Sequence, residues 1–151
     1  MAVLEDRFGR NFPYLRLSII EACNFRCSYC LPDGFHARPD RPQPLSREEI
    51  ARLLRGFADV GLSKLRLTGG EPLLQGAALA KLVVLLKDRR PALHVEVETN
   101  GTVAPHPLLD GLIDQYNISP KLAHSGNATD LALVPERLEA WAKDPRGWFK
   151  F

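Results

Sequence analysis

A regular alternation of strand-like and helix-like segments restricts the fold of this chain more than any other feature of its sequence. Residues of high β propensity, partly with apolar side chains at every second position, predict four strands: Tyr14–Ile20, Lys64–Thr68, His94–Thr99 and Tyr116–Ser119. A fifth strand is expected to begin at Trp148. Because helical patterns separate these strands and the connections are short, the strands should be parallel with right-handed crossovers. The sequence therefore predicts an α/β fold.

The predicted helices are marked by local signals. Ser46 and Glu49 form a capping box at the start of the first helix. Helical spacing predicts the core face of that helix as Ile50, Leu53, Leu54 and Phe57. A second helix should run from about Ala77 to Lys87, a short one near Leu108–Ile113, and a last one from Pro135.

Length, composition and charge limit the class of protein. A chain of 151 residues with 45% hydrophobic and 25% charged residues is typical of a globular domain, so we expect one domain over residues 1–151. No apolar run reaches the roughly 20 residues of a membrane helix, and the N-terminus lacks the apolar stretch of a signal peptide. No membrane association and a cytoplasmic location are therefore expected. The formal net charge of +2 does not predict a nucleic-acid partner.

The three cysteines of the chain, Cys23, Cys27 and Cys30, follow the first predicted strand with CxxxCxxC spacing. An odd number of cysteines in a cytoplasmic chain argues against a disulfide framework. Three thiolates so spaced suit a 4Fe–4S cluster, in which one iron would stay open to a small molecule. The alternatives are a zinc site with His36 as the fourth ligand, which would make the chain an interaction module, and buried cysteines without metal. The stretch Pro32–Pro44 that follows is predicted to be a surface loop.

Polar motifs follow the second, third and fourth predicted strands as well. These motifs are Gly69-Gly70-Glu71-Pro72, Thr99-Asn100-Gly101 and Ser119-Pro120-Lys121. Because the carboxyl ends of parallel strands meet at one edge, all of them should converge with the cysteine loop. Gly69 and Gly70 would let the backbone approach a ligand closely, and Glu71 offers an acceptor for an ammonium group.

The cysteine loop, with an aromatic residue before its last cysteine, and the segment Leu67–Pro72 resemble the two signature motifs of the radical S-adenosylmethionine (SAM) superfamily. The resemblance implies a partial (β/α)6, TIM-like barrel, here incomplete after about the fifth strand. It implies that Cys23, Cys27 and Cys30 bind three irons of the cluster and that SAM chelates the fourth. The residues that would surround the cofactors are Tyr29, Gly69, Gly70, Glu71 and Pro72. An electron donor such as flavodoxin or ferredoxin would reduce the cluster, and SAM would be cleaved to a 5′-deoxyadenosyl radical.

The two halves of the chain resemble different members of this superfamily. Residues from about 5 to 74 resemble the GTP 3′,8-cyclase of molybdenum-cofactor synthesis, which implies that Arg16 and Arg66 lie near a purine nucleotide. Residues from about 95 to 151 resemble 7-carboxy-7-deazaguanine synthase of the queuosine pathway. This second resemblance implies SAM contacts from Thr99, Asn100 and Ser119, and substrate contacts from Lys121 and Asn127. It also raises Mg²⁺ as a further cofactor.

The later strand ends help to shape the substrate pocket, so the first expectation is the deazaguanine synthase reaction. That reaction is the ring contraction of a pterin, 6-carboxy-tetrahydropterin. The alternatives are a protein like GTP 3′,8-cyclase and an inactive fragment that binds the cluster. Since an open barrel edge favours association, a homodimer is a further possibility.

Overall fold

A parallel sheet of five strands, in the order β1-β2-β3-β4-β5, forms the centre of the computed structural model, which describes residues 3–36 and 44–151. The strands are β1 (Tyr14–Ile20), β2 (Lys64–Gly69), β3 (His94–Thr99), β4 (Gln115–Ile118) and β5 (Gly147–Phe149). Each neighbouring pair is parallel. The expected α/β architecture, part of a TIM-like barrel, is therefore confirmed. Residues 37–43 of the predicted Pro32–Pro44 loop lie outside the described residues.

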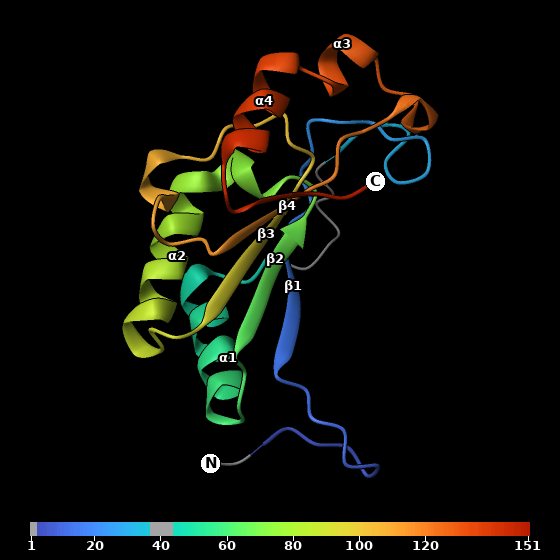
Figure 1. The fold of residues 1–151 in the computed structure, drawn as a ribbon. Coiled ribbons are helices and arrows are strands. Elements are labelled where there is room, and N and C mark those ends of the chain that lie inside the picture. Colours follow the sequence, from blue (N-terminus) through green and yellow to red (C-terminus); the bar gives the residue numbers. More distant parts are fainter. Residues whose placement is uncertain (1–2, 37–43) are drawn as a thin grey trace.

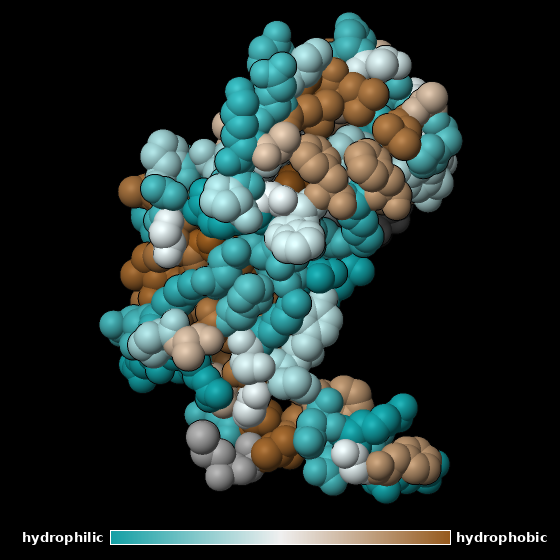
Figure 2. Space-filling model, in the orientation of Figure 1, coloured by the Kyte–Doolittle hydropathy of each residue, from teal (hydrophilic) through white to brown (hydrophobic). Residues whose placement is uncertain are grey.

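The helices and single turns that connect the strands lie mainly on one side of the sheet. The helices are α1 (Arg47–Asp59), α2 (Gly76–Arg89), α3 (Thr129–Ala132) and α4 (Pro135–Lys143). The 3-10 turns are η1 (Pro72–Gln75), η2 (Pro107–Leu109) and η3 (Ala123–Ser125). Figure 1 shows α1 and α2 against one face of the sheet, while the N-terminal segment extends beyond the start of β1. In the space-filling view this segment stands apart from the body of the molecule (Figure 2).

Helix α1 begins at the predicted capping box. The Ser46 hydroxyl accepts from the Glu49 N–H at 3.2 Å, and the Glu49 carboxylate accepts from the Ser46 N–H at 2.8 Å. Leu54 is buried against the sheet, but Leu53 is 42% exposed, so its prediction as a core residue was wrong. Leu53 lies at the border of the apolar stripe, where the neighbouring Leu54 takes the inward position.

The main core lies between the sheet and the helices α1 and α2. Leu65 and Leu67 of β2 and Val95 and Val97 of β3 are fully buried and point to the helices, as strand alternation predicts. Residues of α2 cover them, with Leu79, Leu82, Val83 and Leu86 buried. Burying a side chain of this size contributes roughly 1.5–3 kcal/mol. The intervening strand residues face the other side, and most of them are polar.

Helix α4 anchors the later part of the chain to the sheet. Its Trp141 packs against Tyr116 of β4, with ring centroids 5.0 Å apart. The Trp141 indole N–H also donates to the Gly101 carbonyl at 2.8 Å. This bond fixes the turn that follows β3, where one of the expected site motifs lies.

Several short elements differ from the sequence prediction. The predicted helix near Leu108–Ile113 is only the turn η2, because Asp110 takes an extended conformation and Gly111 a left-handed one with φ of +69°. The short elements η3 and α3 had not been predicted, since they are too short to show an apolar stripe. Within residues 3–36 and 44–151, no helix has the length and apolar character needed to cross a membrane.

Candidate active site

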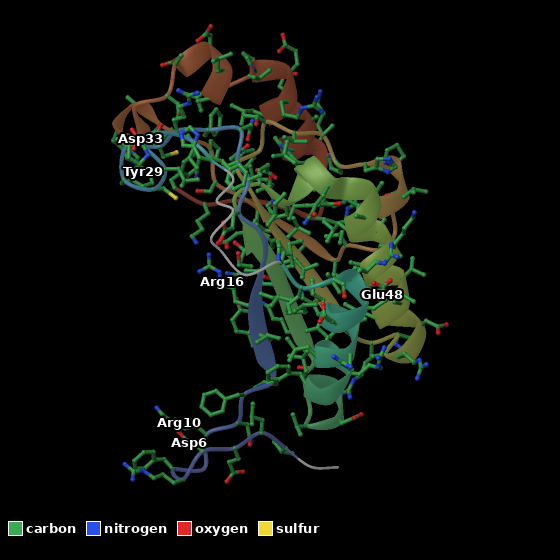
Figure 3. The ribbon with its side chains drawn as sticks, turned by 180° about the vertical axis from the view of Figure 1, so that it is seen from behind. Asp6, Arg10, Arg16, Tyr29, Asp33 and Glu48 are labelled. Carbon is green, nitrogen blue, oxygen red and sulfur yellow. The ribbon has the colours of Figure 1, made fainter. Side chains whose placement is uncertain are left out.

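The cysteine loop lies beyond the carboxyl end of β1, as Figure 3 shows by the positions of Tyr29 and Asp33. A tight turn shapes the loop, because the N–H groups of Cys30 and Leu31 both donate to the Cys27 carbonyl, at 2.9 and 3.0 Å. Cys27 is buried, Cys23 is half-buried and Cys30 is exposed. All three thiols are free. The three cysteines of the loop therefore differ in their exposure to solvent.

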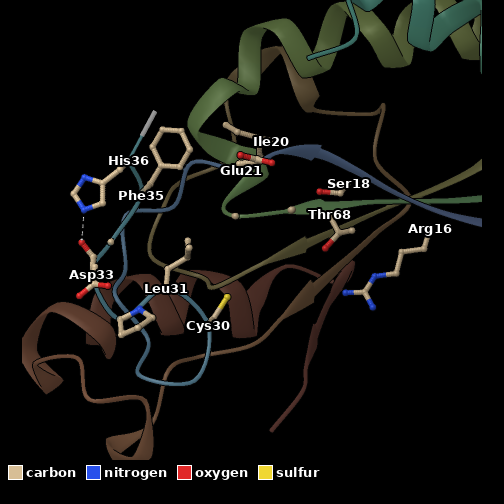
Figure 4. Close-up of a pocket in the computed structure, with 14 residues that line it drawn as sticks. Arg16, Ser18, Ile20, Glu21, Cys30, Leu31, Asp33, Phe35, His36 and Thr68 are labelled. Carbon is tan, nitrogen blue, oxygen red and sulfur yellow. Dashed lines mark hydrogen bonds between the residues drawn. The ribbon is translucent and has the colours of Figure 1, made fainter. Parts of the chain in front are cut away.

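The donor set of this loop fits a cluster better than the zinc site with His36. Burial raises the pKa of the Cys23 thiol, the Phe25 N–H partly offsets this, and the nearby Glu71, Cys27 and Cys30 raise the pKa further. The described residues contain no group of three or more His, Cys, Asp or Glu arranged for one metal ion. The ligands of a cluster bind different irons and therefore stand farther apart than those of one zinc ion. The His36 ring instead bonds the Asp33 carbonyl, with Nε2 2.8 Å from the oxygen (Figure 4).

Gly69 and Gly70 let the end of β2 press against the backbone that leads into the cysteine loop. The Gly70 N–H donates to the Ile20 carbonyl at 2.7 Å, and the Glu71 N–H donates to the Ala22 carbonyl at 2.9 Å. Gly69 has φ of +134°, and a Cβ atom on it would lie 2.1 Å from the Ile20 oxygen. A Cβ atom on Gly70 would lie 2.1 Å from the Ala22 oxygen. The two glycines thus allow the end of β2 to pack closely against the backbone before the cysteine loop. Both glycines also line the cavity described below.

Glu71 is fully buried, and donors of the chain itself occupy its carboxylate. The carboxylate accepts from the Leu73 N–H at 3.1 Å, the Thr99 hydroxyl at 2.9 Å and the Asn100 N–H at 2.7 Å. The sequence predicts that Glu71 offers an acceptor for an ammonium group, and this contact stays a prediction beside the hydrogen bonds that its oxygens accept within the protein. Its observed contacts join the end of β2 to the end of β3. Pro72, which follows it, is buried as the first residue of η1.

Burial raises the pKa of Glu71 above its ordinary value of 4.5, although its hydrogen bonds partly offset this. A carboxyl with a raised pKa contributes stability that is present at low pH and is lost as the pH rises through the folded pKa. In the variant Glu71→Gln this contribution is absent. We therefore expect the difference in unfolding free energy, wild type minus variant, to fall as the pH rises from 4.5. Urea denaturation at several pH values measures it, and a difference that grows with pH would contradict this account.

The end of β3 is also joined to the cysteine loop. The Asn100 amide donates to Asn24 Oδ1 at 2.8 Å, and the Asn24 amide donates to the Thr102 hydroxyl at 2.9 Å. Asn24 was not among the predicted site residues, and its position after Cys23 was the available signal. Thr99 and Asn100 are both buried and bonded within the protein. Their expected contacts with SAM therefore stay a prediction.

The motif after β4 lies at the same edge of the sheet. The Lys121 ammonium lies 3.4 Å from the Ser119 hydroxyl, and its charge lowers the pKa of Glu71 slightly against the effect of burial. The Tyr29 ring stacks on His124, with centroids 5.8 Å apart. The structure thus brings together the motifs that follow β1, β2, β3 and β4, as the sequence predicted.

A cavity of about 790 Å³ opens beside the cysteine loop. Its wall combines strand residues with the loop residues 30–36, and Figure 4 shows Cys30 between Arg16 on one side and His36 on the other. Ser18, Thr68 and the backbone of Gly69 line it as well. The cavity can therefore receive a polar ligand within reach of the cluster loop.

The polar face of the sheet carries an ion-pair network. Arg16 pairs with Glu98 at 2.6 Å, and Lys150 pairs with the same carboxylate at 3.2 Å. Arg66 and Lys64 pair with the buried Glu96, at 2.6 and 2.5 Å. In these described pairs, four cations face two carboxylates, so the face retains positive charge. Figure 3 shows Arg16 on the side of the sheet opposite α1.

The two carboxylates remain ionised, although burial opposes ionisation. Lys64 and Arg66 outweigh burial and lower the pKa of Glu96, while Thr68 and Lys150 do the same for Glu98. Glu96 and Glu98 had not been predicted as site residues. Their alternation with valines in β3 was the signal that both side chains face the polar side.

The expected nucleotide contacts Arg16 and Arg66 lie in register on neighbouring strands, but only Arg16 lines the cavity. Arg66 is held by Glu96, with Nε 2.6 Å from the carboxylate oxygen. Asn127, for which a substrate contact is expected, has its amide against Cys27 and Arg26, and the substrate contact stays a prediction.

The fold and the site define a cofactor-binding barrel protein, and the family follows from comparison. The family model of the Radical SAM superfamily matches residues 17–124 of this chain. The chain therefore belongs to the radical SAM superfamily. For this family the implied cofactors are a 4Fe–4S cluster and SAM, which the three free cysteines and the adjacent glycine motif accommodate.

Two curated relatives with the name GTP 3′,8-cyclase match this chain closely. A GTP 3′,8-cyclase of Stenotrophomonas maltophilia (strain K279a) is 54% identical over 108 residues, which are 72% of this chain and 32% of the relative. A GTP 3′,8-cyclase of Tolumonas auensis is 49% identical over 100 residues, which are 66% of this chain and 29% of the relative. The chain thus spans about a third of the length of these relatives. They match the cyclase alternative better than the expected 7-carboxy-7-deazaguanine synthase.

A solved structure supports the fold. The crystal structure of Streptococcus suis SuiB bound to precursor peptide SuiA is similar with a TM-score of 0.55 and 18% identity. The match covers 78% of this chain and 26% of SuiB. At this identity the similarity concerns the fold alone.

Proposed function

We propose that this chain is a radical SAM protein of the GTP 3′,8-cyclase type, acting on GTP or a closely related purine nucleotide. The observation that carries the proposal is the cavity that Cys30 and Arg16 share. The cyclase relatives support the same assignment. The expectation of a pterin substrate, and of Mg²⁺ with it, is not part of the proposal.

The charges of the polar sheet face fit a nucleotide substrate. A triphosphate is strongly anionic, and guanidinium groups bind phosphate oxygens through paired, charge-assisted hydrogen bonds. The Arg16 side chain is 56% exposed, so it can contact a ligand while its pairing with Glu98 fixes its position. Arg66, at 23% exposure and bound to Glu96, contributes mainly positive potential.

Different residues of the chain would bind the cofactors and the substrate at this site. The cluster and SAM, when bound, supply the radical that removes a hydrogen atom from the substrate. Cys23, Cys27 and Cys30 would hold the cluster, and the backbone at Gly69 and Gly70 would border SAM. The hydroxyl of Ser18 would help to orient the polar substrate between the cysteine loop and Arg16, while the Thr68 hydroxyl holds Glu98. A one-electron donor such as flavodoxin or ferredoxin belongs to the same proposal.

Removal of the Arg16 side chain should weaken GTP binding. A charge-assisted hydrogen bond contributes about 1.5–3 kcal/mol, which corresponds to roughly a 10- to 100-fold increase in the dissociation constant for Arg16→Ala. Equilibrium dialysis of GTP against the reconstituted chain measures this change.

A matched arginine on the outer surface controls for loss of charge. Arg47 pairs with Glu48 on α1, away from the cavity. Arg47→Ala should bind GTP as the wild type does. If Arg16→Ala also binds GTP with the affinity of the wild type, the nucleotide does not contact Arg16, and the proposed site is wrong.

A further inference from the structure

Asn127 directs its side-chain amide at the sulfur of a cluster cysteine. Its Nδ2 lies 3.2 Å from Cys27 Sγ and 3.1 Å from the Ser125 hydroxyl. Its Oδ1 accepts from the Arg26 N–H at 3.0 Å. The backbone N–H of Arg26 can only donate, so the amide oxygen must face it, and the NH2 group must face the sulfur. The orientation of the amide is therefore fixed by its own contacts.

The segment that carries Asn127 is fastened to the cysteine loop. The Ser28 N–H donates to the Ser125 carbonyl at 2.9 Å, and Ser125 is fully buried. Gly126 has φ of +76°, and this left-handed turn brings Asn127 back toward the loop. Asn127 and Cys27 are 100 residues apart in the chain, so the contact depends on the completed fold.

A hydrogen bond to a sulfur that ligates iron has an electronic consequence. It stabilises negative charge on the sulfur, and a cluster gains negative charge when it is reduced. Hydrogen bonds to the sulfurs are among the factors that set cluster potentials. Residues that contact metal ligands tune the metal in the same way. Cys27 is only 5% exposed, so water does not replace this donor easily.

We propose that Asn127 is a positioning residue that donates a hydrogen bond to Cys27 Sγ and thereby raises the reduction potential of the cluster. The bond would make the transfer of one electron to the cluster more favourable. This inference rests on the cluster assignment but not on GTP as the substrate.

The test is a redox titration, monitored by electron paramagnetic resonance, of the anaerobically reconstituted chain, with dithionite as the reductant and no substrate present. Asn127→Asp keeps an oxygen that accepts from Arg26 but loses the N–H donor, and Asn127→Ala loses both. We expect the midpoint potential of each variant to shift to more negative values. Ser28→Ala, which removes a weak 3.4 Å bond to the His124 carbonyl in the same region, should keep the wild-type potential.

The outcomes separate the electronic role from a structural one. Wild-type potentials in both Asn127 variants at full iron content would overturn the proposal. So would an equal shift in Ser28→Ala, because loosening of the loop would then explain the effect. Loss of the cluster from both Asn127 variants would assign the residue to cluster assembly, which also contradicts the role stated here. Since GTP is absent, failure of the substrate assignment would leave these results unchanged.

Discussion

The variant Cys27→Ala should lose the iron–sulfur cluster and, with it, all cleavage of SAM. Cys27 would be the middle one of three cysteine ligands, and its replacement would leave the loop with Cys23 and Cys30. Iron analysis and the visible absorption of the reconstituted protein measure the loss. The expected result is a colourless protein that forms no 5′-deoxyadenosine above background.

Loss of the cluster must be distinguished from loss of the fold. Cys27 belongs to a small apolar cluster with Phe25 and Ala132, which is separate from the main core. Its truncation should therefore destabilise the chain by only about 1 kcal/mol, near the low end for buried side chains. The circular dichroism of Cys27→Ala should match that of the wild type. Full iron content in a folded Cys27→Ala protein would show that the cysteine is not a ligand.

The variant Gly70→Ala should destabilise the chain strongly, although it adds a single methyl group. The new Cβ atom would lie 2.1 Å from the Ala22 carbonyl oxygen and 2.6 Å from the Glu21 oxygen. Both contacts are with backbone, which cannot rotate away. Overpacking of this kind costs about 3 kcal/mol, and here it also separates the end of β2 from the chain that leads to Cys23. Urea denaturation measures the stability, and iron content measures the damage to the loop.

A glycine elsewhere in the chain provides the control. Gly56 lies inside α1, and no heavy atom lies within 4 Å of the position that its Cβ would take. Gly56→Ala should therefore stabilise the chain by up to about 1 kcal/mol, as expected for alanine in a helix interior. If Gly70→Ala is as stable as the wild type, the close backbone approach at this site is not real.

The periodic parts of the fold could be predicted because their signals are local. The strand alternation around Leu65 and Leu67 and the capping box of Ser46 and Glu49 each depend on residues within a few positions. The structure confirms these elements. Leu53 shows the limit of this reasoning, because the pattern identifies an apolar stripe but not which residue at its border remains exposed.

The contacts of the site could not be predicted in the same way. The motif after β2 identified Glu71, but its partner Thr99 is 28 residues away and had been assigned to SAM. Whether a polar side chain faces the ligand or another strand depends on how neighbouring strand ends meet. Asn127 is the clearest case, because its bond to Cys27 exists only after the segment beyond β4 returns to the cysteine loop.

The two halves of the chain predict different reactions, that of 7-carboxy-7-deazaguanine synthase and that of GTP 3′,8-cyclase. The later strand ends had favoured the deazaguanine synthase, whereas the curated relatives are GTP 3′,8-cyclases. The polar face of the sheet agrees with the relatives, because Arg16, Lys64 and Arg66 all belong to the half that resembles the cyclase.

The yield of 5′-deoxyadenosine from the reconstituted, dithionite-reduced chain with SAM tests the central claim most directly. The reaction should be run without substrate, with GTP and with 6-carboxy-tetrahydropterin. The account predicts that GTP stimulates SAM cleavage above the yield without substrate and that the pterin does not. Stimulation by the pterin alone, or an intact cluster that cleaves no SAM under any of these conditions, would contradict it.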